Sequence, residues 1–392
     1  MRAENLHRPL LHVAAVTAGL ASGATHAAEW VVTPSAIAST HTQQNPYLRP
    51  DEKSQDDVST GLSTQASLSM TRDTERLSLS LQPSASIYRY PDKNQLDRNE
   101  QHVNGSLSWR GETSSWAGSV TMARDTTLTS QLGDTGLTQG NQRHELYGGS
   151  IGPTWQFSER LSAQASVGSS VTRYPGSATA FLQNYRYDSG SMGMSYVLSD
   201  RAVLSVSGSA GRLNSDAQAD HTDNASLVVN AQYTWSPVWS IGAGAGPSLV
   251  RVGGTSERGV VYRASLSRSF ENALLSLVVS RSQQPSGSAI ITNVEQAGLS
   301  FGAPLTERLT SSVTANYTRR RNALRNFDVD LNRVQYARLE AGLSWRVSPG
   351  WQIGAGAGNA FQKTGSFFFN DQTGRGYDVS LSVSWNGKPY VH

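Results

Sequence analysis

The chain has 392 residues, of which 37% are hydrophobic and 16% are charged, and its formal net charge is +3 at pH 7. It contains no Cys, which excludes a disulfide framework and thiolate chemistry. The small net charge predicts no strong attraction to nucleic acid. Beyond the N-terminus, no stretch has the roughly 20 apolar residues of a transmembrane helix.

The N-terminus has the three parts of a secretory signal peptide. Arg2 and Arg8 precede an apolar stretch over residues 10–24, and the small residues around Ala27 follow it. We place the cleavage after Ala27, because cleavage after Ala28 would put the bulky His26 three residues upstream. The predicted division is a signal peptide over residues 1–27 and one mature domain over residues 28–392.

Apolar and small polar residues alternate along most of the mature chain. In one segment Leu77, Leu79 and Leu81 alternate with Ser78 and Ser80. Because neighbouring side chains of a strand point to opposite faces, each such segment has one apolar and one polar face. The pattern predicts eighteen strands, near residues 30–42, 58–72, 76–90, 102–111, 116–125, 143–157, 161–173, 185–198, 202–213, 223–235, 239–252, 259–270, 273–283, 289–303, 309–319, 332–347, 351–362 and 375–385.

The polar half of each strand decides between two kinds of all-β protein. A soluble sandwich or propeller packs its apolar faces into a core, whereas a membrane barrel turns them to lipid and encloses a polar, wet interior. Closure also pairs every backbone N–H and C=O, which lipid cannot do. We therefore predict one all-β antiparallel transmembrane β-barrel of about 18 strands, in the cell outer membrane after export to the periplasm.

The connections alternate in length, which orients the predicted barrel. Short turns, such as residues 158–160 and 306–308, are assigned to the periplasmic side, and longer loops to the extracellular side. The longer connections are 43–57, 90–101, 125–142, 174–184, 214–223, 320–331 and 363–374, with two briefer ones near 253–258 and 284–289. Either 43–57 or 125–142 has the length to fold inward.

The aromatic residues segregate between the two ends of the predicted strands, as expected of rings at membrane–water interfaces. All nine Trp lie near the short turns: Trp30, Trp109, Trp116, Trp155, Trp235, Trp239, Trp345, Trp351 and Trp385. Many Tyr lie near the longer loops: Tyr88, Tyr90, Tyr174, Tyr185, Tyr187, Tyr262, Tyr317, Tyr336 and Tyr377. We interpret the two sets as two aromatic girdles.

Of the 33 basic residues only four are Lys, and several of the cations end the strands that rise toward the longer loops. Each shares the parity of its strand's apolar residues: Arg89, Arg124, Arg173, Arg212, Arg251, Arg281, Arg319 and Lys363. They would form an outward ring at the rim. Because guanidinium binds phosphate well, one hypothesis is that the ring contacts lipopolysaccharide. The alternative is that a bulge resets the parity or that the residues only mark the water boundary.

A second set has the opposite parity and is predicted to line the pore: Arg110, Arg263, Arg320, Arg338, Glu340, Arg346, Tyr90, Tyr174, Tyr187 and Tyr336. Arg pairs with carboxylates and aromatic rings stack on sugar faces, so these side chains suit anionic or hydroxylated solutes. The competing interpretation is that they pair with each other and brace the wall.

The sequence gives little support for catalysis. His102, His144 and His221 lie on separate predicted strands, and we do not expect His221 to pair with the nearby Asp223, so no Ser–His–acid group is expected. Residues 92–97 lack the glycine and closing Glu of a calcium loop. We predict no enzyme activity, no metal site and no cofactor.

Three short stretches carry a resemblance to a known family. They are Arg124-Asp125-Thr126-Thr127 with the loop that follows, Asn45-Pro46-Tyr47-Leu48, and Arg89-Tyr90-Pro91-Asp92. The chain resembles the porin-like outer-membrane barrels of Gram-negative bacteria that are associated with exopolysaccharide synthesis and exosortase systems. The resemblance implies passage of a secreted polysaccharide, with its export apparatus as a partner. It implies no catalytic residues.

The last predicted strand has Tyr377, Val379, Leu381, Val383 and Trp385 on one face. It resembles the C-terminal signal that the outer-membrane barrel assembly machinery recognises, with Trp385 in place of a terminal aromatic residue. The function we expect is a channel that passes exopolysaccharide or related solutes. The alternatives are a structural or adhesion barrel with a plugged lumen, and a general diffusion porin.

Overall fold

The computed structural model describes residues 29–50, 57–130, 141–176, 182–216, 220–323, 333–366 and 369–391. The predicted signal peptide, residues 1–27, lies outside the described residues. No helix in the described part of the chain is long and apolar enough to cross a membrane.

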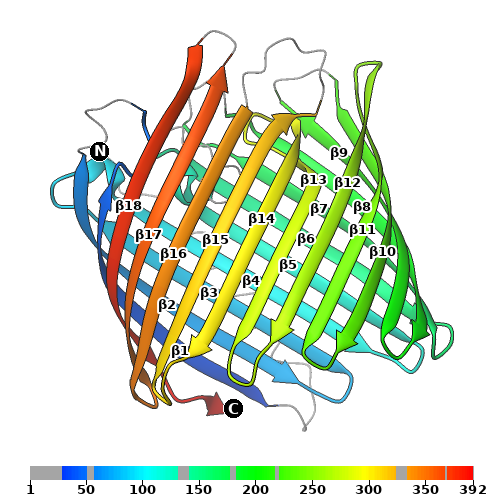
Figure 1. Ribbon diagram of the computed structural model, residues 1–392, viewed down its shortest axis with the longest axis horizontal. Coiled ribbons are helices and arrows are strands. Elements are labelled where there is room, and N and C mark those ends of the chain that lie inside the picture. Colours follow the sequence, from blue (N-terminus) through cyan, green and yellow to red (C-terminus); the bar gives the residue numbers. More distant parts are fainter. Residues whose placement is uncertain are drawn as a thin grey trace.

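The described residues form eighteen long strands and one short one (Figure 1). They are β1 Trp30–Gln44, β2 Val58–Asp73, β3 Leu77–Arg89, β4 Arg98–Arg110, β5 Ser114–Thr126, β6 Arg143–Gln156, β7 Leu161–Arg173, β8 Tyr185–Ser199, β9 Ala202–Ser215, β10 Thr222–Ser236, β11 Trp239–Val252, β12 Thr255–Ser269, β13 Leu274–Pro285, β14 Ile291–Pro304, β15 Leu309–Asn322, β16 Arg333–Ser348, β17 Trp351–Ser366, β18 Phe369–Asn386 and β19 Tyr390–Val391. A 3₁₀ turn, η2, spans Asn94–Leu96.

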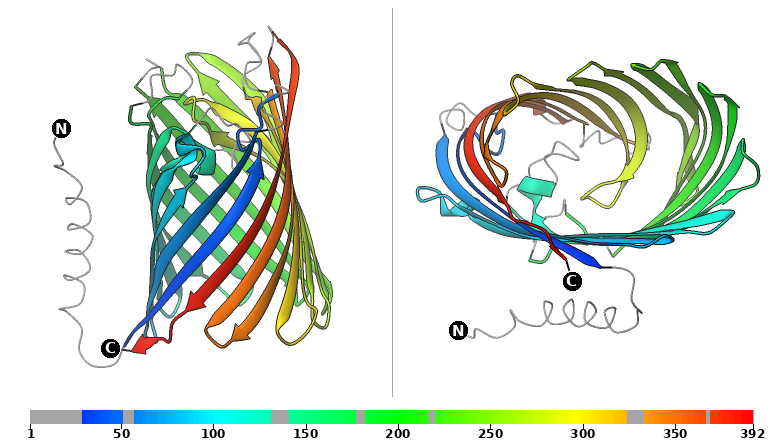
Figure 2. Two further views of the ribbon diagram at one scale, coloured as in Figure 1. Left: turned by 90° about the vertical axis from the view of Figure 1, so that its left-hand side faces the viewer. Right: turned by 90° about the horizontal axis from the view of Figure 1, so that it is seen from below.

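The strands close into one antiparallel barrel, which confirms the predicted fold class. Each long strand pairs with its neighbours in the chain, and β18 returns to pair with β1 from Ser35–Asn386 to Gln44–Tyr377. The last two residues of the described chain, in β19, continue that seam by pairing with Val31 and Val32. Figure 2 shows the closed wall from the side and from below.

The pairing register separates an outward face from an inward face. Directly opposite residues of antiparallel strands lie on one face. The outward face can therefore be traced from Leu62 on β2 to Arg89 and Ile87 on β3, and from there through each strand pair around the ring. The outward set holds the large exposed apolar side chains, such as Val167, Met192 and Trp235. The inward set is mostly Ser, Thr, Asn, Gln and Gly.

The positions of the aromatic residues agree with the sequence only in part. All nine Trp lie on the outward face, close to the short turns. The predicted tyrosine girdle is wrong for six of its nine members, because Tyr88, Tyr90, Tyr174, Tyr185, Tyr187 and Tyr336 lie on the inner side of the wall. Only Tyr262, Tyr317 and Tyr377 of that set lie outward.

Three connections differ from their predicted lengths. Strand β4 begins at Arg98, four residues earlier than predicted, because Arg98 pairs with Tyr88 across the hairpin. The connection near 253–258 is a two-residue turn, and Gly253 and Gly254 adopt the positive φ angles, +49° and +85°, that such a hairpin turn requires. The long connection predicted over 363–374 is mostly strand, since β17 runs to Ser366 and β18 begins at Phe369.

Candidate functional site

The first residues after β5 fold into the lumen. Residues 127–130 form one helical turn inside the barrel wall (Figure 2). Leu128 packs against Tyr90 and Leu96, and all three side chains are buried. The amide of Thr127 donates to the carbonyl of Gln142 (2.8 Å), which ties the two ends of the connection together. The turn therefore narrows the lumen at the end where the longer loops lie.

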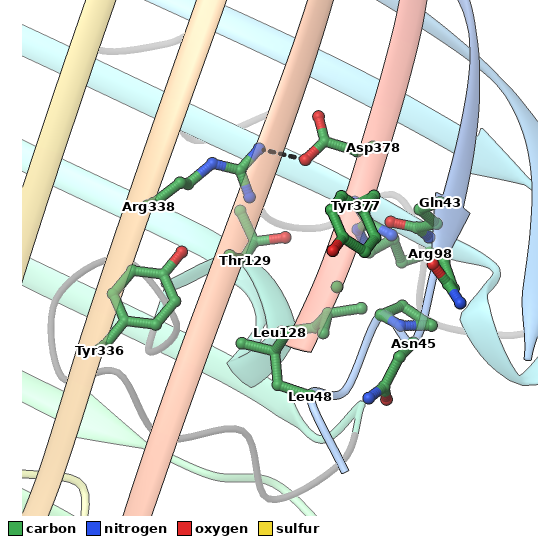
Figure 3. A pocket seen from close by; sticks show the side chains of 14 residues that line it. Gln43, Asn45, Leu48, Arg98, Leu128, Thr129, Tyr336, Arg338, Tyr377 and Asp378 are labelled. Carbon is green, nitrogen blue, oxygen red and sulfur yellow. Dashed lines mark hydrogen bonds and ion pairs between the residues drawn. The ribbon is translucent and has the colours of Figure 1, made fainter. Parts of the chain in front are cut away.

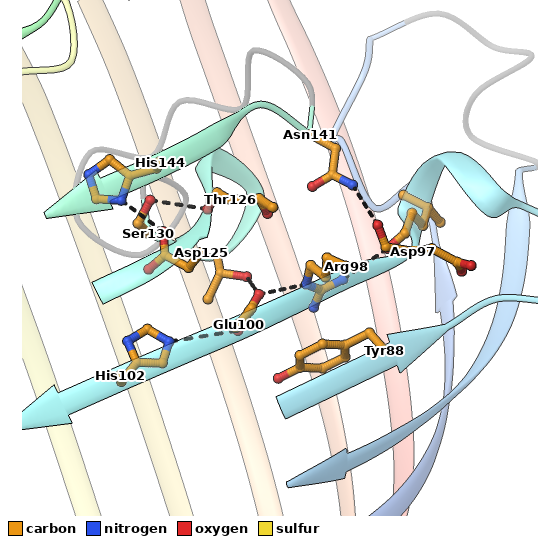
Figure 4. A network of polar contacts seen from close by, with 12 residues as sticks. Tyr88, Asp97, Arg98, Glu100, His102, Asp125, Thr126, Ser130, Asn141 and His144 are labelled. Carbon is orange, nitrogen blue, oxygen red and sulfur yellow. Dashed lines mark hydrogen bonds and ion pairs between the residues drawn. The ribbon is translucent and has the colours of Figure 1, made fainter. Parts of the chain in front are cut away.

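An ionic row on the inner face of β4 supports this turn. Arg98 and Glu100 form an ion pair (Nε–Oε1 2.8 Å), and both side chains are largely buried, 12% and 3% exposed (Figure 4). The guanidinium also lies 3.8 Å above the centre of the Tyr88 ring. The hydroxyl of Thr129 in the inward turn donates to the same carboxylate. Each buried charge therefore has a partner, as buried charges require.

Two histidine–carboxylate contacts lie beside this row. His144 Nδ1 and Asp125 Oδ1 are 2.7 Å apart on adjacent strands, and both side chains are buried. His102 Nε2 lies 4.0 Å from Glu100 Oε2, on the same strand face (Figure 4). The ring of Tyr174 lies 5.4 Å from the His144 ring. These contacts join side chains of the wall at the strand ends beside the inward turn.

The wall on the other side of the turn carries a second ionic group. Arg338 on β16 donates from Nε to Glu340 (2.7 Å) and from Nη2 to Asp378 on β18 (3.0 Å). Two cavities lie beside this wall. The larger, of about 330 Å³, is bounded by the turn and the first loop, and the smaller, of about 290 Å³, lies against the inner face of β1, β2 and β3. Both are lined by Gln43, Arg98, Arg338 and Asp378, and the larger is shown in Figure 3.

Tyr90, which directly follows β3, is joined to the inner face of β1. Its hydroxyl contacts Nε2 of His41 (2.5 Å) and accepts a hydrogen bond from Nε2 of Gln43 (2.8 Å). Burial raises the pKa of the Tyr90 phenol, and the neighbouring Arg98 opposes that shift. The phenol is therefore neutral and serves as a structural hydrogen-bonding group.

Across the lumen, a second group of inward side chains links distant strands. Leu213, Val250, Ile291 and Ala323 form a buried apolar cluster, against which Tyr185 and Tyr187 pack. The amide of Gln183 also donates to the carbonyl of Gly287 (2.9 Å), so two loops from different parts of the ring are joined. Both sides of the long-loop end are therefore packed inside, whereas the short-turn half lacks such an inner cluster among the described residues.

The ten residues predicted to line the pore lie on the inner side of the wall, but their accessibility differs. Arg110, Arg263 and Arg346 are exposed to the lumen, and Arg338, Glu340 and Tyr187 are half-buried. Tyr90, Tyr174, Tyr336 and Arg320 are buried, between 1% and 6% exposed. In this conformation these four cannot stack on or bind a solute, because loops and neighbouring strands cover them. Their burial favours the bracing interpretation for these four residues.

The eight rim cations all fall in the outward set of the register: Arg89, Arg124, Arg173, Arg212, Arg251, Arg281, Arg319 and Lys363. They do not form a uniform ring of positive charge. Glu145 lies 3.7 Å from Arg124, Asp223 lies 2.8 Å from Arg212, and Glu295 lies between Arg281 and Arg319. Carboxylates on intervening strands therefore neutralise part of the rim.

The expectation about His221 and Asp223 is wrong. Their side chains form a contact of 3.3 Å (Nε2–Oδ2), because residues two apart on a strand share one face. Asp223 also accepts two hydrogen bonds from Arg212. In the described part of the chain no group of three or more His, Asp or Glu side chains is arranged to hold a metal ion.

Sequence reasoning missed several residues of the narrowed region: His41, Gln43, Arg98, Glu100, Asp125, His144 and Asp378. Arg98 and Glu100 were assigned to a loop, which hid the row that they form with His102. Extending the alternation of β4 by four residues would have revealed that row. No local signal marks Asp125 or Asp378, whose partners lie on other strands.

Comparison with known proteins gives structural matches only. No protein-family model matches the chain, and no curated protein matches it. Among solved structures, the chain is similar to OccAB4 of Acinetobacter baumannii, with a TM-score of 0.48, 10% identity, and 93% of this chain and 98% of that chain covered. It is similar to OccK2 (OpdF) of Pseudomonas aeruginosa, with a TM-score of 0.47, 13% identity, and coverage of 92% and 97%. It is also similar to OpdK of Pseudomonas aeruginosa with vanillate, with a TM-score of 0.47, 10% identity, and coverage of 92% and 99%.

Proposed function

We propose that this protein is an outer-membrane channel for hydrophilic solutes, narrowed at its extracellular end by the inward turn at residues 127–130. The observation that carries the proposal is the closed ring of eighteen strands, with large apolar side chains outward and small polar ones inward. Such a ring suits a membrane exterior and a wet interior. The narrowed region favours small solutes over folded macromolecules.

Planar-bilayer recording tests this proposal. The purified barrel should give discrete single-channel steps in KCl that are absent with heat-denatured protein. If neither the native chain nor a variant with a loosened inward turn conducts, the channel proposal fails. Conductance only in the loosened variant would support a plugged barrel with a structural or adhesive role.

We also propose that the solute is exopolysaccharide or a related anionic carbohydrate. This choice is supported by Arg110, Arg263 and Arg346, which are exposed on the inner face. Guanidinium groups pair well with carboxylates. If an acidic oligosaccharide blocks the current at micromolar concentration and a neutral one of equal length does not, the proposal holds. Equal block by both, or by neither, would favour a general diffusion porin.

A further inference from the structure

The outward face of the barrel is hollowed at two places just below the long-loop end. One hollow, of about 450 Å³, lies over strands β13 to β17, which Figure 1 shows side by side. Its floor is Ala297, Ala315 and Ala337, and Tyr317 and Phe361 stand beside them. The other hollow, of about 570 Å³, lies over β7 to β11, with Gly190, Ala210 and Ala225 in its lining. We call them the first and the second hollow.

The register explains why the first hollow exists. Opposite one another on the outward face lie Val279, Ala297, Tyr317, Ala337 and Phe361, and the next row is Leu277, Leu299, Ala315, Leu339 and Asn359. Alanines on three adjacent strands leave a depression between larger side chains. Most of its lining is apolar, so it suits an acyl chain.

Cations stand directly above the first hollow. Two residues farther along each strand, about 7 Å away, the same face carries a row of Arg281, Glu295, Arg319, Gln335 and Lys363. This row has three cations and one carboxylate, so its net charge is +2. The hollow is therefore an apolar surface below an excess of positive charge.

The two arginines of this row are incompletely satisfied within the described chain. Their Nη1 atoms lie 3.8 Å (Arg281) and 3.7 Å (Arg319) from the two oxygens of Glu295, which is too long for a hydrogen bond. Their buried Nε atoms have no hydrogen-bond partner among the described residues. The Nη groups of these side chains, which are 29% and 27% exposed, can therefore donate to an external anion.

The second hollow differs in its charges. Its row is Asp188, Arg212, Asp223 and Arg251, with two carboxylates and two cations. Arg212 donates to Asp223 from Nε at 2.8 Å and from Nη2 at 3.2 Å, and Arg186 donates to Asp188 at 2.9 Å. These charges neutralise one another, so the second hollow is an internal control for the first.

We propose that the first hollow binds a phosphorylated, multiply acylated glycolipid of the outer leaflet, of the kind found in lipopolysaccharide. Arg281 and Arg319 contact a phosphate, and an acyl chain fills the depression over Ala297, Ala315 and Ala337. The lipid thus binds at one side of the barrel and not around the whole rim. The proposal rests on the outer-membrane location proposed above, but not on an open lumen.

Native mass spectrometry of the detergent-purified barrel with added bisphosphorylated lipid A tests the site. The double variant R281Q/R319Q should lower the bound lipid about tenfold, which corresponds to one charge-assisted hydrogen bond. The matched variant R212Q/R251Q removes the same charge at the second hollow and should leave binding unchanged. Equal losses in both variants would show attraction by overall charge only and would overturn the proposal.

A second variant tests the acyl part of the site without altering charge. A315F fills the floor of the first hollow and should also lower lipid A binding, whereas the same change at the second hollow, A210F, should not. Lipid A without phosphates should bind weakly to the native chain. If phosphatidylglycerol bound as tightly as lipid A, or if A315F bound normally, the assignment to an outer-leaflet glycolipid would be wrong. All variants should keep the native bilayer conductance. A negative result for lipid binding would therefore leave the channel proposal standing.

Discussion

At the scale of single residues, one short motif recurs along the strands. Whether a copy lies on the inner or the outer face of the barrel depends on its position in the alternation of its strand. Within the strands, an arginine followed two residues later by a carboxylate occurs as Arg98/Glu100, Arg143/Glu145, Arg186/Asp188 and Arg338/Glu340, and all four pairs form ion pairs. Residues two apart on a strand share a face. The first and last pairs therefore lie on the inner face, and the other two lie on the outer face.

Two of these pairs provide a matched test of burial. E100Q should destabilise the barrel by about 3 kcal/mol, because it leaves the buried Arg98 guanidinium without its anion. We expect this as a lower urea midpoint of unfolding, followed by tryptophan fluorescence in detergent micelles.

The control is D188N. The Arg186–Asp188 pair has the same spacing and a similar distance, 2.9 Å, but its side chains are 60% and 38% exposed. Exposed pairs of this kind contribute about 0–1 kcal/mol, so the midpoint should barely move. Equal shifts in E100Q and D188N would contradict the role given to burial of Arg98 and Glu100.

At the scale of single elements, the inward turn at residues 127–130 is packed inside the long-loop end of the lumen. L128A removes the apolar contact of the turn with Tyr90 and Leu96, at a cost of about 2–3 kcal/mol. The turn should then leave the lumen for part of the time. We expect larger and noisier single-channel steps than in the native protein.

The matched control is L343A, which removes the same side chain from the outward face, where Leu343 is 47% exposed. Its conductance should equal that of the native protein. Unchanged conductance in L128A, in protein that is fully folded, would mean that the turn does not narrow the conducting path.

The short strand β19 closes the last part of the barrel seam. It pairs with Val31 and Val32, and the amide of Gly387 donates to the carbonyl of Pro34 (2.8 Å). Truncation after Asn386 leaves this end of β1 without partners on one side, which costs about 1–2 kcal/mol. The temperature at which the folded band is lost on electrophoresis should fall by several degrees, and an unchanged temperature would contradict a clasping role for β19.

Element boundaries could be predicted from the sequence wherever the alternation was uninterrupted. The bounds of β7 and β11 agree with the prediction at both ends. They could not be predicted where a polar strand end resembles a loop, as at Arg98 and at the β17–β18 hairpin. Such ends extend beyond the apolar band, where hydrogen bonding to the neighbouring strand, and not hydrophobicity, decides the conformation.

At the scale of the whole molecule, strand number and the identity of the two faces could be predicted, because both depend on a period of two that every strand repeats. The contents of the lumen could not. Leu48 packs against Tyr336 and Ala360, which lie hundreds of residues away in the sequence and come close only because the ring closes. The inward tyrosines were assigned to a membrane girdle from their height along the strands alone, although the alternation already placed Tyr90, Tyr174, Tyr187 and Tyr336 on the inner face.

We infer that the apolar side chains of the barrel face lipid and that the polar ones enclose water. Because the chain has no Cys, single cysteines placed along β18 at Val379, Ser380, Leu381, Ser382 and Val383 measure this directly in proteoliposomes. We predict that a charged, water-soluble thiol reagent modifies only S380C and S382C, while a bimane label on V379C, L381C and V383C is quenched by brominated lipid. Loss of this alternation, or its reversal, would contradict the account.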